Sequence, residues 1–173
     1  LGIALPAAGR YGVGQIFFPQ DAALRKEMEA VVEKGLEDEG FVFLGWRDVA
    51  VDNSCLSMDP KIRSSEPFHR QVFIGLPDGV TMDADTFERR LYIARKLISG
   101  RVFHAYHGLD NDFYIVSMSC RTVVYKGMFL GWQLGAYYRD FHDPDFESAL
   151  GLVSFEIEQM IQTGVCPPMV DLD

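Results

Sequence analysis

Three cysteines are the residues of this sequence that could act as nucleophiles: Cys55, Cys120 and Cys166. A thiol attacks as its thiolate, which forms readily only beside a base or in an electropositive setting. Arg121 follows Cys120 directly, but a single neighbouring cation is a common and unspecific feature. We therefore expect Cys55 and Cys120 to be turn-flanking or half-buried thiols, and Cys166, in a proline-rich stretch, to be the weakest candidate.

A pair of histidines could begin a metal site. His104 and His107 are three residues apart, and Asp110 and Asp112 follow them. Structural zinc sites add nearby thiols or a second pair of ligands, which this stretch lacks. We therefore expect a polar surface loop here, and no metal site.

Charged groups elsewhere could likewise do chemistry or simply be surface charge. Asp143, Asp145 and Glu147 surround a turn, and paired carboxylates can do acid–base work when their environments separate their pKa values. Nothing in the sequence predicts that they are buried, so a solvated turn is expected. Glu66 and the pair Arg89-Arg90 are interpreted in the same way, as surface charge.

The glycine-rich run from Gly9 to Gly14 could suggest a phosphate-binding loop. Such a loop needs its glycines between a strand and the start of a helix, so that backbone N–H groups face the anion. Here the glycines precede and enter an apolar run, so they predict a turn and close packing of a strand.

Composition narrows the possible functions. The 173 residues are 48% hydrophobic and carry a net charge of −9, which fits one domain or a large piece of one and argues against a nucleic-acid partner. No window approaches the roughly 18 apolar residues of a membrane span. Three widely spaced cysteines indicate a reducing compartment rather than a disulfide framework. The chain starts at Leu1 without signal-peptide features, which suggests a cropped, processed or incomplete sequence.

Hydrophobic periodicity predicts strands alternating with two amphipathic helices. Strands are expected at Tyr11–Phe18, at Phe41–Trp46 (covered on both faces) and at Gln71–Gly75. The polar stretch Asp52–Pro67 is expected to be loop. One helix follows a cap at Asp21 and ends near Gly40, and a second follows Asp83 or Asp85 and ends at Gly100.

The C-terminal half is harder to interpret. Residues 112–127 read as a strand, a tight polar turn and a second strand over Thr122–Tyr125, and Phe113, Tyr114, Ile115 and Val116 are expected to be mostly buried. Residues 128–138 read as a short buried helix. Residues 148–153 suit a strand or the start of a helix equally well. Together the elements indicate an α/β or α+β layered fold.

Several segments, in this order, resemble the large subunit of glutamate synthase. They are GRYGVGQIFFPQD, FLGWRDVAVDNSCL, SSEPFHRQVFIG, FERRLYIARKLIS, DFYIVSMSCRTVVYKGM and QLGAYYRDFHDPDFESALGLV. Each is weak alone, but their order and spacing over residues 9–153 make the resemblance specific. The matching part of that family is the central segment of its N-terminal glutamine amidotransferase type-2 (glutaminase) domain.

This resemblance implies an α+β fold of the N-terminal-nucleophile-hydrolase type, an αββα sandwich with antiparallel sheets between helices, of which this chain would form a part. It also implies hydrolysis of L-glutamine, with ammonia channelled to the reductive synthesis of L-glutamate from 2-oxoglutarate. In the family the nucleophile is a cysteine at the mature N-terminus, whose α-amino group serves as base. FMN and an iron–sulfur cluster belong to the full-length protein, with none expected in this segment.

The sequence departs from the family at both ends. Leu1 cannot be a nucleophile, and after the SALGLV segment the family's arginine- and threonine-containing glutamine-binding run is replaced by Ser154–Ile161. The Asn-Gly pair of the family's oxyanion hole is absent as well. No catalytic, cofactor-binding or metal-binding residue of the family therefore carries over, and we expect the segment to be inactive alone. Residues 1–153 form the resembling segment, and 154–173 a divergent tail.

Three hypotheses remain open from the sequence. The first is a fragment of a glutamate synthase, with the remaining domains and a small electron-donating subunit as partners, in the cytoplasm or in a plant plastid. The second is a stand-alone, noncatalytic α/β module that binds a partner or a small ligand. The third, a hydrolase that uses Cys120 or Cys55, has the least support.

Overall fold

The computed structural model describes residues 2–56, 60–107, 113–148 and 150–151. The chain divides into two compact units, Leu1–Asp143 and Pro144–Asp173. The first unit contains every helix and strand of the described residues. In the second unit, the described residues adopt no regular structure. The sequence predicted regular structure over residues 148–153. Residues 148, 150 and 151 show none, and residues 149, 152 and 153 lie outside the described residues.

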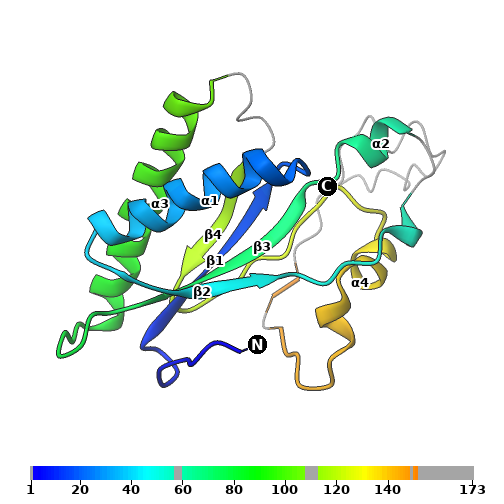
Figure 1. Ribbon diagram of the computed structural model, residues 1–173. Helices are drawn as coiled ribbons and strands as arrows, with labels where there is room; N and C mark the ends of the chain where they lie inside the picture. Colours follow the sequence, from blue (N-terminus) through cyan, green and yellow to red (C-terminus); the bar gives the residue numbers. More distant parts are fainter. Residues whose placement is uncertain (1, 57–59, 108–112, 149, 152–173) are drawn as a thin grey trace, which may run out of the picture. The chain divides into compact units, whose positions relative to one another are not determined.

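A four-stranded antiparallel sheet forms the centre of the first unit, with strand order β2-β3-β1-β4 (Figure 1). The strands are β1 (Tyr11–Phe18), β2 (Val42–Asp48), β3 (Phe68–Gly75) and β4 (Tyr114–Ser119). Together with the helices below, the sheet confirms the predicted α+β class. It is consistent with part of an N-terminal-nucleophile-type sandwich.

Two long helices, α1 (Ala22–Asp38) and α3 (Ala84–Ala105), pack side by side on one face of the sheet (Figure 1). Both begin at the predicted aspartates, because Asp21 accepts a hydrogen bond from the Leu24 N–H and Asp83 one from the Thr86 N–H. Gly40 has a φ of +75° just beyond the end of α1, where a left-handed residue closes the helix. Among the described residues, neither helix is long and apolar enough to span a membrane.

The prediction that α3 ends at Gly100 was wrong, since the helix continues to Ala105. Val102, one residue beyond Ser-Gly-Arg, is fully buried and holds the last turns against the sheet. Tertiary packing here outweighs the low helix propensity of one glycine.

The apolar core lies between the two helices and the sheet. Residues at alternate strand positions meet the inner stripes of the helices, as periodicity predicted. The core comprises Ile16, Phe18, Met28, Val32, Leu36, Phe41, Val72, Ile74, Phe87, Leu91, Ala94, Ile98, Val102, Ile115 and Met118. Gly12 and Gly14 allow this packing, because an added Cβ would lie 2.8 Å from Leu91 Cδ1 and 2.6 Å from Val72 Cγ1 respectively. The structural interpretation of the glycine-rich run is confirmed.

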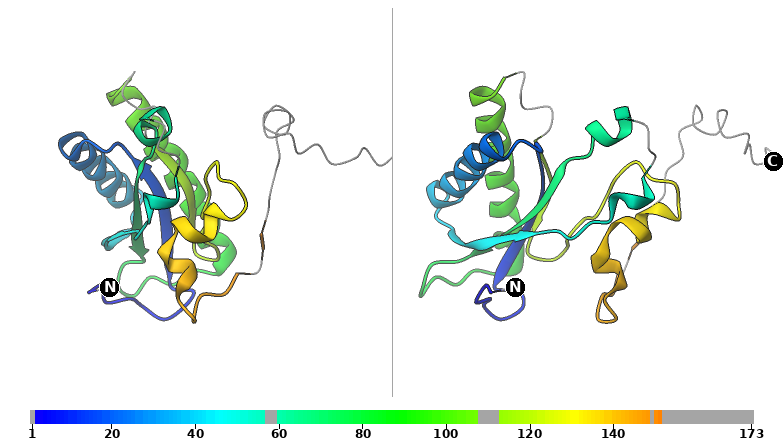
Figure 2. Two further views of the ribbon diagram at one scale, coloured as in Figure 1. Left: turned by 90° about the vertical axis from the view of Figure 1, so that its right-hand side faces the viewer. Right: turned by 45° about the vertical axis from the view of Figure 1, so that its right-hand side comes forward.

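The opposite side of the sheet carries buried polar side chains. Their positions alternate with those of the apolar core, and they are Gln15, His69, Gln71, Ser117 and Ser119. Residues 120–142 run along this side, away from α1 and α3 in both figures, and include α4 (Gln133–Tyr137) and the 3-10 turn η3 (Arg139–His142) (Figures 1 and 2). Two further short elements, η1 (Asn53–Cys55) and α2 (Pro60–Ser64), interrupt the stretch predicted to be loop.

The second strand expected after β4 is not formed. The Val124 N–H donates to Ser117 Oγ at 3.1 Å, and the N–H groups of Arg121 and Thr122 both donate to Ser119 Oγ. Serine hydroxyls thus capture the backbone donors that a hairpin would use, and such local bonds compete with strand pairing. The segment leaves the sheet edge as an irregular chain.

Three other expectations of burial were wrong. β2 lies at the edge of the sheet and is mostly half-exposed, so it is not covered on both faces. Tyr114, expected in the core, is 45% exposed, whereas Ile115 and Val116 are buried as predicted. In the predicted buried helix 128–138, only Gln133–Tyr137 are helical, and Met128, Leu130 and Trp132 are exposed.

Candidate functional site

A polar network occupies the side of the sheet opposite the helices. Arg47, from β2, donates from Nη1 to Asp140 Oδ2 at 2.8 Å and to Gln71 Oε1 at 2.9 Å, and it also pairs with Asp140 through Nη2. Tyr125 donates its hydroxyl to Asp140 Oδ2 at 2.6 Å and accepts from Gln71 Nε2 at 3.0 Å. The network therefore connects two strands to segments more than fifty residues further along the chain.

Burial and charge act in opposite directions on the carboxyl group of this network. Partial burial by itself raises the pKa of Asp140, but hydrogen bonds from Arg47 and Tyr125 outweigh it and hold the pKa below the ordinary 3.8. The hydrogen bond to Asp140 raises the pKa of Arg47 despite burial, and burial with the same carboxylate raises the pKa of Tyr125. At neutral pH the pair is thus a charged, bidentate bridge.

One donor in the network remains unpaired. Gln15 is fully buried, and its Oε1 accepts from Gln71 Nε2 at 2.9 Å. Its own Nε2 has no hydrogen-bond partner among the described residues. An unpaired buried donor costs about 1–3 kcal/mol, and this cost lies inside the fold because Gln15 is fully buried.

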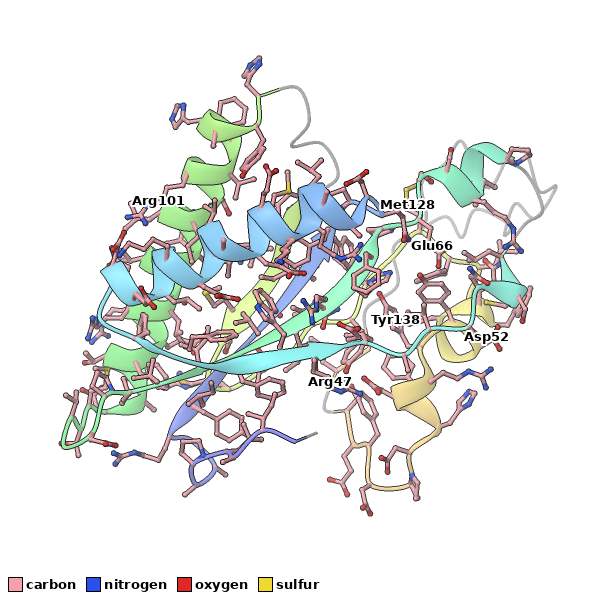
Figure 3. All side chains as sticks on the ribbon, viewed as in Figure 1. Arg47, Asp52, Glu66, Arg101, Met128 and Tyr138 are labelled. Carbon is pink, nitrogen blue, oxygen red and sulfur yellow. The ribbon has the colours of Figure 1, made fainter. Side chains whose placement is uncertain are left out.

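Beside this network, a second relay joins His69, Tyr137 and Glu66. Tyr137 donates its hydroxyl to Glu66 Oε1 at 2.7 Å, and its oxygen lies 2.9 Å from His69 Nε2, which fixes that ring nitrogen as the donor. Burial lowers the pKa of His69 to about 4, and it raises that of Tyr137 with help from Glu66. Figure 3 shows Glu66 and Tyr138 near the end of β2 and the start of β3, far from Arg101 on α3.

The contacts of this relay indicate a structural role. The aromatic rings of Phe17, Tyr137 and Tyr138 all contact the His69 ring edge-on, with centroids 4.7, 5.5 and 5.4 Å away. The neutral imidazole of His69, enclosed by these rings, holds the side chains of Tyr137 and Tyr138 in place. No candidate nucleophile takes part in the hydrogen bonds of this relay. Glu66, expected to be plain surface charge, is therefore a bonded member of the buried cluster.

Cys120 lies in an environment that suppresses its reactivity. Its thiol donates to Glu88 Oε2 at 3.2 Å, and its N–H donates to the same oxygen at 2.9 Å. Burial first, and then the Glu88 carboxylate, raise the pKa of the thiol to about 11. Arg121 instead pairs with Asp85. Cys120 is consequently a protonated thiol at neutral pH, as a structural role predicts.

Cys55 is similarly unsuited to attack. It is half-buried in η1, and its thiol donates to the carbonyl oxygen of Asp52 at 3.2 Å. It packs with Val49, Tyr137 and Tyr138 in a small cluster on the polar side of the sheet. Cys166 lies outside the described residues. The expectation of half-buried thiols is confirmed for the two cysteines that the structure describes.

His104 and His107 lie at the end of α3, and both rings contact that of Phe103, with centroids 5.5 Å away in each case. Asp110 and Asp112 lie outside the described residues. Within the described part of the chain, no three histidine, cysteine or carboxylate side chains are grouped to hold a metal ion.

The remaining charged candidates fall into two groups, those that are exposed and one that is bonded within the fold. Asp143 is exposed in the first unit, and Asp145 and Glu147 are exposed in the second. Arg89 is also exposed. Arg90 is not plain surface charge: it donates to the Glu39 carbonyl at the end of α1 and lies over the Phe41 ring, 5.0 Å from its centroid. It thus ties α3 to α1.

Comparison with known proteins finds a family model and several relatives that match this chain. The model of the family described as "Glutamine amidotransferases class-II" matches residues 1–156. The chain is 42% identical over 151 residues to the glutamate synthase [NADPH] large chain of Bacillus subtilis, covering 87% of this chain. It is 37% identical over 146 residues to ferredoxin-dependent glutamate synthase 2 of Synechocystis, covering 84%. A similar match, 34% identical and covering 88% of this chain, is glutamate synthase [NADH] of Schizosaccharomyces pombe.

These matches cover only a small share of the relatives. The aligned region is 10% of the Bacillus protein, 9% of the Synechocystis protein and 7% of the Schizosaccharomyces protein. The chain thus spans a tenth or less of the length of each of these relatives.

Proposed function

Because this chain belongs to the class II glutamine amidotransferase family, we propose that it forms part of the scaffold of a glutaminase domain in a glutamate synthase. The observation that carries the proposal is the match over residues 1–156 together with the matches to glutamate synthases. The whole domain would hydrolyse L-glutamine, and the ammonia would serve the reductive synthesis of L-glutamate from 2-oxoglutarate.

The reacting thiol in this proposal is neither Cys55 nor Cys120. Acyl transfer from glutamine needs a thiolate with an adjacent base. Cys120 faces the Glu88 carboxylate, which disfavours the thiolate, and Cys55 donates to a backbone carbonyl. Both environments support a structural role, and the nucleophile would come from elsewhere in the domain.

The remainder of the domain would pack on the side of the sheet that carries the polar network. The irregular segment 121–132 bonds to this side through Tyr125 and exposes apolar side chains, which are Val123, Val124, Met128, Leu130 and Trp132. Exposed apolar side chains gathered in one segment are typical of an interface between parts of one domain.

Other parts of a glutamate synthase would supply the redox chemistry. Within the proposal, residues 1–153 are the amidotransferase segment, 154–173 a divergent tail, and FMN and the iron–sulfur cluster are held outside this segment. The names of the relatives specify ferredoxin, NADPH or NADH, so the electron donor differs among them. One Arabidopsis relative is named chloroplastic and another chloroplastic/mitochondrial, and a cytoplasmic or plastid location fits this proposal.

The decisive experiment measures ammonia release from glutamine by the native protein that contains this chain, after its mass has been determined. Cys55→Ala and Cys120→Ala should each retain the wild-type rate, and the isolated 173-residue chain should release no ammonia. Loss of activity in Cys120→Ala, with an unchanged unfolding midpoint, would contradict the assignment. A native product of only 19.5 kDa that releases no ammonia would favour the stand-alone binding module instead.

A further inference from the structure

The outward face of α3 exposes a stripe of apolar side chains. Four large ones lie on it: Tyr92, Ile93, Leu97 and Phe103 are 56%, 49%, 44% and 49% exposed. At 100° per residue they fall on one side of the helix, opposite the buried stripe of Phe87, Leu91, Ala94, Ile98 and Val102. Large apolar side chains exposed together on one side of a helix are typical of an interaction surface.

Gly100 lies at the centre of this stripe. An added Cβ would meet nothing within 4 Å, so no contact within the described chain requires a glycine there. In a helix interior, glycine is less favourable than alanine. A shallow depression lies over Gly100, and its rim is formed by Lys96, Leu97, Arg101, His104 and Ala105. A depression of this shape accepts a protruding side chain from a second helix and lets its backbone approach closely.

Charge around the stripe selects the partner. From Arg89 to Ala105, α3 contains five arginines and lysines and no carboxylate, in a chain with a net charge of −9. Arg89, Lys96 and Arg101 are exposed. Arg101 already pairs with Asp38, and Lys96 lies 5.6 Å from the centre of the Tyr92 ring, so both stay beside the stripe. A second copy docked by the same face would bring these cations against each other, which disfavours self-association.

We propose that the outward face of α3 docks an acidic amphipathic helix. The partner's apolar side chains, at i, i+4 and i+7 spacing, lie along Ile93, Leu97 and Phe103, with one of them in the depression over Gly100. Its glutamates and aspartates face Lys96 and Arg101. The surface is separate from the polar side of the sheet, so it serves a contact other than completion of the glutaminase domain.

Binding of a defined probe tests this proposal. The probe is a fluorescein-labelled helical peptide of about 18 residues, or five turns, with leucines on one face and glutamates beside them. The matched control peptide has the same composition with its leucines spread around the helix. Fluorescence anisotropy with the 173-residue chain should give at least about tenfold tighter binding for the one-faced peptide, and addition of salt should weaken it.

Two variants and one control locate the site. Gly100→Leu fills the depression and Lys96→Glu reverses a rim charge, and each should weaken binding about tenfold. Lys26→Glu makes the same charge change on an exposed position of α1 and should leave binding unchanged. Unfolding midpoints of all three show that the fold is kept.

Several results would overturn the proposal. They are equal binding of the two peptides, no binding of either, or loss of binding in Lys26→Glu equal to that in Lys96→Glu. Binding of phosphatidylglycerol vesicles but not the peptide would assign the face to a membrane surface. Dimerisation in sedimentation that Gly100→Leu abolishes would assign it to a second copy.

Discussion

The two sides of the sheet differ in what holds them together. The side under α1 and α3 is an apolar core of buried side chains, and the helices that cover it belong to this chain. The opposite side holds charged and hydrogen-bonded groups, and segment 121–132 exposes apolar side chains on it. One side is complete within the described residues, whereas the other retains an unpaired buried donor and outward apolar groups.

This difference explains how a chain that spans about a tenth of its relatives can have a defined fold. The apolar side is built mainly from β1, α1, β3, α3 and β4, with Phe41 just before β2, all within the matched segment. Hydrophobic burial on that side supplies most of the stabilisation. The polar side fixes orientation, since charged networks contribute specificity more than net stability.

The largest effect is expected from a cavity on the apolar side. Ile115 is 2% exposed, and Ile115→Ala should lower the free energy of unfolding by about 2–5 kcal/mol. Ile93→Ala makes the same truncation on the exposed face of α3 and should change it by less than about 0.5 kcal/mol. Urea unfolding of both variants measures the difference. Equal losses would mean that the apolar side is not the core.

A pH titration sharpens the comparison on the polar side. The fold keeps His69 neutral, with a pKa of about 4 against 6.5 in the unfolded chain. Stability is therefore full above pH 6.5, falls as the pH drops toward 4 because the unfolded chain binds the proton first, and levels off below 4. The total loss from this group is roughly 3 kcal/mol.

The matched variants are His69→Gln and His104→Gln. Urea unfolding between pH 7 and pH 4 should show a flatter pH dependence for His69→Gln, and the wild-type slope for His104→Gln, whose side chain is exposed. An unchanged slope in His69→Gln would show that the imidazole is not held neutral by burial.

Breaking the charged bridge tests the same side. Asp140→Asn removes the partner of a largely buried Arg47 and should cost about 1–3 kcal/mol at pH 7. Since the pKa of Asp140 is lowered, its contribution is present above pH 3.8 and is lost as the pH falls below that value. Asp38→Asn, at the exposed Arg101 pair, should leave the urea midpoint unchanged. Similar midpoints for the two variants would place the Arg47–Asp140 pair among ordinary surface pairs.

The smallest effect separates two helical glycines. Gly100→Ala should raise the free energy of unfolding by about 0.5–1 kcal/mol, because its Cβ meets open space and alanine favours a helix. Gly35→Ala, on the inner face of α1, should lower it, because its Cβ would collide with Ile98 Cγ1. Thermal unfolding of the two variants measures the opposite signs, and a loss in Gly100→Ala would show that this glycine is needed within the fold.

The sequence predicted the apolar side well and the polar side poorly. Periodicity located α1, α3 and the strands, and aspartates marked both helix starts, because helix caps and apolar stripes are local signals. The bridge from Arg47 to Asp140 spans 93 residues and leaves no such local signal. The second strand after β4 was predicted over Thr122–Tyr125, but serine hydroxyls on β4 bind its backbone donors instead. The exposed edge position of β2 is likewise a matter of tertiary arrangement.

Oxidative footprinting of the methionines tests the difference between the two sides most directly. Met28 and Met118, on the apolar side, are 0% and 4% exposed, and Met128, in segment 121–132, is 84% exposed. With hydroxyl radicals and mass spectrometry, Met128 of the 173-residue chain should oxidise at least roughly tenfold faster than the other two. In the native protein that contains the chain, Met128 should become protected while Met28 and Met118 stay slow. Rapid oxidation of Met28 in the isolated chain, or an unprotected Met128 in a longer native protein, would contradict the account.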